Sequence, residues 1–77
     1  MIDLKRIEEI NHKIDVFQNY YHKQLQKVKE LTAEFVVNTE NEVIKQAYID
    51  AENRLIEFER EIQLLQDELS FFYNLGI

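Results

Sequence analysis

The sequence contains no cysteine, no proline and no tryptophan, and its only glycine is Gly76. Because cysteine is missing, the chain forms no disulfide and offers no thiolate ligand to a metal. Because proline is missing and the glycine is next to last, no residue in the interior interrupts a helix. The longest apolar runs are three residues long, whereas a membrane-spanning helix needs about 20. The 77 residues support one small domain at most, and packing must stabilise it.

The same scarcities bear on where the protein works. Residues 1–6 lack the apolar stretch of a signal peptide, and the absence of cysteine suits a reducing compartment. We therefore expect a cytoplasmic protein that does not bind membranes. The abundance of Ile, Asn, Lys and Glu is typical of an AT-rich bacterial or phage gene.

Charge is distributed unevenly along the chain. The net charge is −6, and residues 1–38 carry six basic and six acidic side chains, whereas residues 39–77 carry three basic and nine acidic ones. An acidic surface disfavours nucleic acid and anionic membranes as partners. It is compatible with a basic protein partner, and ordinary solubility explains it equally well.

Apolar residues recur with alternating spacings of three and four, in two stripes that mirror each other about the point between Thr39 and Glu40. We call these two stripes together the seam. The first stripe comprises Ile7, Ile10, Ile14, Phe17, Tyr21, Gln24, Val28, Leu31 and Phe35. The second comprises Ile44, Tyr48, Ala51, Leu55, Phe58, Ile62, Leu65, Leu69 and Phe72. The mirrored positions form nine pairs, which place Tyr21 opposite Phe58 and Gln24 opposite Leu55.

This repeat predicts an all-α fold, an antiparallel two-helix coiled-coil hairpin, as one domain over residues 1–77. We expect helix one over about residues 3–37, a turn over about 38–41 and helix two over about 40–74. Gln24 is the one polar seam residue, and we expect it to fix the register of the two helices.

Polar residues at the expected helix ends support these boundaries. Asp3 is suited to cap the first helix, and Thr39 followed by Glu42 has the spacing of a capping box for the second helix. Gly76 fits the left-handed position that often follows a helix.

Groups that carry catalysis or bind metals are not arranged productively. Glu9 and His12 have the Glu-x-x-His spacing of di-iron helical bundles, but the heptad frame directs His12 outward and neither stripe contains an inward-facing glutamate. Ser70 is the only serine, and the sequence has no glycine-rich phosphate loop. We expect no catalytic, cofactor or metal site, and no enzymatic activity.

A second face of helix two is apolar. At 100° per residue, one line of side chains falls on the side away from the seam, and we call it the outward stripe. The outward stripe comprises Ile49, Asn53, Ile56, Arg60, Leu64, Asp67 and Phe71. A helix that is apolar on two faces requires two neighbours. We therefore expect five of these residues to bind a protein partner, namely Ile49, Ile56, Arg60, Leu64 and Phe71.

The sequence thus favours a small acidic protein-interaction module, a regulator, inhibitor or adaptor, that works by helix packing. The partner is a second copy of the chain or another protein, and we expect a homodimer that forms a four-helix bundle. A purely structural homodimeric bundle or an assembly chaperone is the nearest alternative.

Three further alternatives remain open. Carboxylates along one flank of helix two, Asp50, Glu57, Glu61 and Glu68, suit an acidic inhibitor that blocks a nucleic-acid-binding protein. Aromatic and basic residues of helix one, Tyr20, Tyr21, Lys23, Lys27 and Lys29, suit an RNA-binding hairpin dimer, an architecture known from small plasmid-encoded RNA-binding proteins. Leaderless secreted hairpins of the WXG type have a similar size, and Tyr48 and Glu52 match the spacing of their export signal, but their Trp-x-Gly turn is absent.

Overall fold

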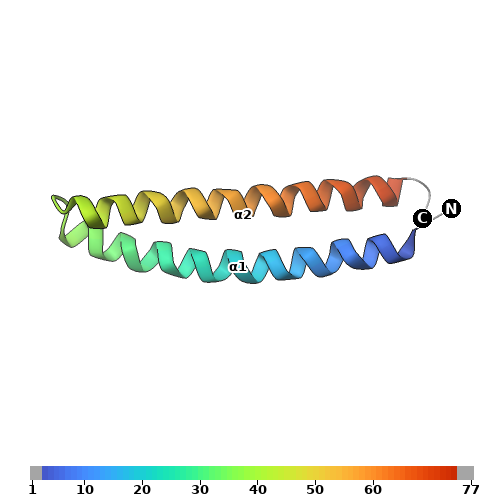
Figure 1. Cartoon of the computed structure of the whole chain (residues 1–77), viewed down its shortest axis with the longest axis horizontal. Coiled ribbons are helices and arrows are strands. Elements are labelled where there is room, and N and C mark those ends of the chain that lie inside the picture. Colours follow the sequence, from blue (N-terminus) through green and yellow to red (C-terminus); the bar gives the residue numbers. More distant parts are fainter. Residues whose placement is uncertain (1–2, 75–77) are drawn as a thin grey trace.

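The computed structural model describes residues 3–74, which form two helices, α1 (Leu4–Val37) and α2 (Glu42–Asn74). The helices lie side by side and antiparallel, with the turn at one end and the start of α1 beside the end of α2 at the other (Figure 1). The predicted all-α helical hairpin is therefore confirmed. The molecule measures 58 × 15 × 13 Å, and its radius of gyration is 17.3 Å, against roughly 11–12 Å for a compact domain of this length.

The start of α1 agrees with its predicted cap. Asp3 is the N-cap residue, and its Oδ1 accepts a hydrogen bond from the backbone N–H of Arg6 at 3.1 Å. At the other end of α1, the backbone N–H of Asn38 donates to the carbonyl oxygens of Glu34 and Phe35. These bonds satisfy backbone groups that the helix itself leaves unpaired.

The predicted capping box of Thr39 and Glu42 is wrong. The helix begins at Glu42, two residues later than predicted, so Thr39 lies in the turn. Asn41 takes the capping role, because its Oδ1 accepts from the backbone N–H groups of Val43 at 3.0 Å and Ile44 at 3.2 Å. A turn closed by the hydrogen bond from Asn41 N–H to the Asn38 carbonyl displaces the helix start. The prediction for Gly76 lies outside the described residues.

Every seam residue of both helices is buried or half-buried. Complete burial is nevertheless rare in this two-helix arrangement, because each helix has only one neighbour. Ile10 is fully buried at 0% exposure. The other buried seam residues are Ile7, Ile14, Val28 and Ala51. Four of these five lie on α1, whereas the other seam residues of α2 are half-buried.

The individual side-chain contacts do not follow the mirrored pairs one by one. Gln24 Nε2 donates to the backbone carbonyl of Ala51 at 2.9 Å, a group that in an α-helix lies beside the N–H of Leu55. Likewise, Phe58 has its ring contacts with Phe17 at 6.3 Å and Tyr20 at 5.8 Å between centroids. Side chains of packed helices enter the spaces between the facing residues, so reflection of the sequence gives the register but not the individual contacts.

Candidate protein-contact surface

The outward stripe is exposed along α2. Ile49, Ile56, Leu64 and Phe71 expose 39, 49, 58 and 60% of their surfaces, respectively. The three polar members, Asn53, Arg60 and Asp67, are also exposed. Although single exposed apolar residues are ordinary on protein surfaces, these four recur along one helix face with polar residues between them. That arrangement resembles the centre of a helix–helix interface more than a solvated face.

Two charged groups of this face, those of Asp67 and Arg60, form no ion pair within residues 3–74. Gln63 Nε2 donates to Asp67 Oδ1 at 2.9 Å, which leaves the second carboxylate oxygen of Asp67 available. Within residues 3–74 both salt bridges are made by Arg6, so the guanidinium of Arg60 has no ionic partner in the hairpin. A shallow hollow beside Arg60 is lined by Ile56, Glu59, Arg60 and Gln63.

The hairpin exposes more surface than its mass requires. Its accessible area is 5973 Å², whereas a folded monomer of 9.4 kDa exposes roughly 5,000 Å². The excess of about 1,000 Å² is close to the roughly 800 Å² that each partner contributes to a standard interface.

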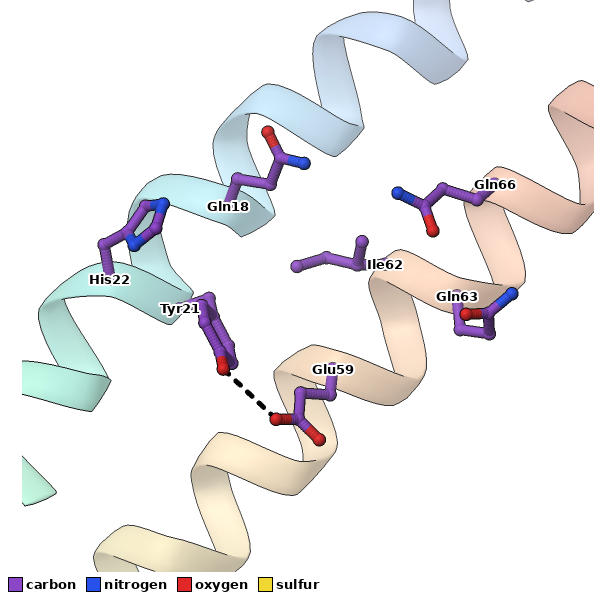
Figure 2. A pocket seen from close by; sticks show the side chains of 7 residues that line it. All are labelled: Gln18, Tyr21, His22, Glu59, Ile62, Gln63 and Gln66. Carbon is purple, nitrogen blue, oxygen red and sulfur yellow. Dashed lines mark hydrogen bonds between the residues drawn. The ribbon is translucent and has the colours of Figure 1, made fainter.

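A second surface feature is a groove between the helices (Figure 2). Gln18, Tyr21 and His22 come from α1, whereas Glu59, Ile62, Gln63 and Gln66 come from α2. The Tyr21 hydroxyl donates to Glu59 Oε1 at 3.2 Å. Burial and then this contact with Glu59 raise the pKa of Tyr21. The groove thus holds a hydrogen bond that joins α1 and α2.

The aromatic and basic cluster of α1 is partly engaged within the hairpin. The ring of Tyr20 stacks on Phe58 of α2, with an interplanar angle of 29°. Arg54 lies on the same phenyl ring, its Cζ 5.6 Å from the centroid, in the geometry of a cation–π contact. Tyr20 thus packs on α2 while 48% of its surface stays exposed, and the hydroxyl of Tyr21 binds Glu59 of α2.

The acidic flank of α2 is not a uniform solvated row. Glu68 is half-buried, and its Oε1 accepts hydrogen bonds from Arg6 Nε at 2.9 Å and Nη2 at 2.6 Å. Asp50 accepts a hydrogen bond from Gln46 at 2.9 Å. Glu57 and Glu61 are exposed. One of the four predicted carboxylates therefore holds the hairpin together, which shortens the flank that faces solvent.

Apolar side chains at the turn were missed by the sequence reasoning. Val36, Val37 and Val43 are 68, 80 and 79% exposed, and they flank the turn on both helices. The sequence indicates them because these apolar residues do not fit the three–four spacing of the seam. Since they sit at the tip of the hairpin, this cluster is separated from the outward stripe.

Groups of three or more His, Asp or Glu side chains that could hold a metal ion are absent from residues 3–74. Over the same range, neither helix is both long enough and apolar enough to cross a membrane. No protein-family model, curated protein or solved structure matches the chain.

Proposed function

We propose that this chain is a small acidic protein-interaction module, with no enzymatic activity, that associates through the outward stripe of α2. The observation that carries the proposal is the exposure of Ile56, Leu64 and Phe71 on the helix face away from α1. The mechanism is burial of these side chains against another helix, with Arg60 and Asp67 fixing the alignment.

Energetics support an association partner. A core of this size supplies no more than about 3–5 kcal/mol, and natural proteins of this size add a disulfide, a metal or a partner subunit. The cysteine-free chain has no disulfide, and residues 3–74 form no metal-ion cluster. A partner therefore supplies the missing burial, and association with a second copy produces a four-helix assembly. The expected setting is the cytoplasm, as a regulator, inhibitor or adaptor.

A photo-activated cross-linking residue at position 64, in the native cells, tests this function. The matched control carries the same residue at Ala33, which is exposed on α1. We expect a protein adduct from position 64 and none from position 33. Absence of an adduct at 64, or equal adducts at both positions, overturns the proposed surface.

Substitution of the same face provides a second test. Ile56→Asp and Phe71→Asp place a charge on the surface without touching the seam, so helicity should be retained while association is lost. Ala33→Asp adds the same charge to the outer face of α1 and should change neither property. Retained association in both α2 variants contradicts the proposal.

A further inference from the structure

We infer that the partner of the outward stripe is a second copy of this chain, bound antiparallel through α2 about a two-fold axis between Gln63 and Leu64. This inference rests on the proposed function and specifies the partner and the register. In this register Arg60 of each copy meets Asp67 of the other, and Ile56 of each copy meets Phe71 of the other.

The spacing of the charged residues on α2 determines the proposed register. From Ile56 to Arg60 is four residues, from Arg60 to Asp67 seven, and from Asp67 to Phe71 four. These four members of the stripe are thus spaced symmetrically about the point between Gln63 and Leu64, with opposite charges on its two sides. An antiparallel two-fold axis converts such a pattern into two identical ion pairs, since each copy supplies one cation and one anion.

Within residues 3–74 neither charge has an ionic partner. Arg60 and Asp67 lie about 10 Å apart along the helix, beyond salt-bridge distance. Arg60 takes no part in a salt bridge of the described hairpin, and Asp67 is bound only by the neutral amide of Gln63 among its hydrogen bonds. A second copy supplies the missing counter-charge for both groups at once.

An alternative axis through Arg60 is less favourable. It pairs Ile49 with Phe71 and Ile56 with Leu64, and so aligns all four apolar residues. It also places two guanidinium groups against each other, and like charges at an interface cost several kcal/mol. Moving the axis to the position between Gln63 and Leu64 removes this repulsion and adds two attractive pairs. The same shift leaves Ile49 outside the paired segment.

The shape of the face agrees with the chosen axis. In this register Phe71 of the second copy lies opposite Ile56, at one end of the hollow lined by Ile56, Glu59, Arg60 and Gln63. Phe71 is 60% exposed, and an aromatic ring seated in a hollow is a common interface anchor. Because the stripe faces away from α1, the two α2 helices lie at the centre and the four helices form a row rather than a square bundle.

Charge reversal tests the register directly. Arg60→Asp alone sets two carboxylates against each other at both pairs, and Asp67→Arg alone sets two guanidinium groups against each other. Each variant should raise the homodimer dissociation constant by about 100-fold or more. Mixed together, the two variants regain both opposite-charge pairs and should form a heterodimer with nearly the wild-type constant. Lys23→Asp, a charge reversal on the exposed surface of α1, should leave the constant unchanged.

Engineered cysteines provide an independent measurement, since the natural chain has none. Leu64→Cys lies beside the proposed axis and should form an intermolecular disulfide on mild oxidation. Ile49→Cys should not, because its two copies are roughly 40 Å apart in this register. Cross-linking at Arg60→Cys but not at Leu64→Cys overturns the register in favour of the alternative axis.

The outcomes separate this inference from the proposed function. A monomeric wild type at every concentration, or a mixture of the reversed variants that associates no better than each alone, overturns the self-association. If position 64 still cross-links to a different protein, the function of the stripe stands without it. Absence of any adduct at position 64 overturns both the self-association and the proposed function.

Discussion

Arg6 and Glu68 join the start of α1 to the end of α2. The guanidinium Nε and Nη2 both donate to Glu68 Oε1, at 2.9 and 2.6 Å, and Nη1 lies 3.5 Å from Glu9 Oε2. The hydrogen bond with Glu68 is the main cause of a raised pKa of Arg6. This ion pair closes the open end of the hairpin, opposite the turn, where two separate helix termini would otherwise be held by the seam alone.

Removal of this ion pair should weaken the hairpin modestly. Both side chains are partly exposed, at 34% and 37%, so we expect a coupling free energy of about 0.5–1 kcal/mol between them. A double-mutant cycle of Arg6→Ala and Glu68→Ala, followed by urea unfolding, measures this value. The coupling should decrease as salt increases. A coupling of zero at low salt contradicts the assigned role.

Ile10 should be the most sensitive apolar position. Ile10→Ala removes a fully buried side chain, which costs about 2–5 kcal/mol. Since a core of this size supplies roughly 3–5 kcal/mol, the variant should be largely unfolded by circular dichroism. Leu4→Ala, at a residue 66% exposed on the same helix, should remain folded. Equal effects of the two substitutions would show that the seam is not the core.

The cap of α2 distinguishes the observed helix start from the predicted one. Asn41→Ala should lower the free energy of unfolding by about 1 kcal/mol, because two backbone N–H groups lose their acceptor. Thr39→Ala should have a much smaller effect. Thermal unfolding of both variants measures these losses of stability. A larger loss for Thr39→Ala than for Asn41→Ala would support the predicted capping box instead.

Gln24 should fix the register at a cost in stability. Its amide donates to the Ala51 carbonyl within an otherwise apolar seam. Gln24→Leu should raise the free energy of unfolding while allowing the helices to slide, as polar core residues do in coiled coils. Urea unfolding measures the first effect, and amide hydrogen exchange across the seam measures the second. A less stable variant with unchanged protection would refute the register role.

Tyrosine ionisation should destabilise the hairpin at high pH. Tyr21 and Tyr48 have pKa values raised from 10.0, Tyr21 mainly by burial and Tyr48 mainly by its hydrogen bond to Glu52. The folded state therefore holds these protons more tightly than the unfolded state. This stability is complete below about pH 10 and is lost as the pH rises through the folded values. Unfolding followed across that range measures the loss, which Tyr48→Phe should reduce.

The seam could be predicted from the sequence because a single repeat determines which residues belong to it. Both stripes keep the three–four spacing, so burial of Ile7, Ile10 and Ile14 on α1 follows from periodicity alone. Individual contacts were not readable. The atom that Gln24 binds depends on how the side chains interdigitate, and reflection of the positions does not specify it.

The sequence also contains the information for the ion pair between Arg6 and Glu68, which was overlooked. Arg6 directly precedes Ile7, and Glu68 directly precedes Leu69. Flanking positions of this kind face each other in an antiparallel pair, so the ion pair was predictable once the helices were aligned. Glu68 was instead grouped with the acidic flank. The helix start at Glu42 was harder to predict, since Thr39 and Asn41 are both good caps, and only the turn geometry selects between them.

The molar mass in solution, measured by light scattering over a range of concentrations, is the decisive measurement. Association through α2 predicts a wild-type mass of twice 9.4 kDa, and a Phe71→Asp variant that is equally helical and has half that mass. A wild type that stays at 9.4 kDa at every concentration would contradict self-association, as would a Phe71→Asp variant that remains dimeric.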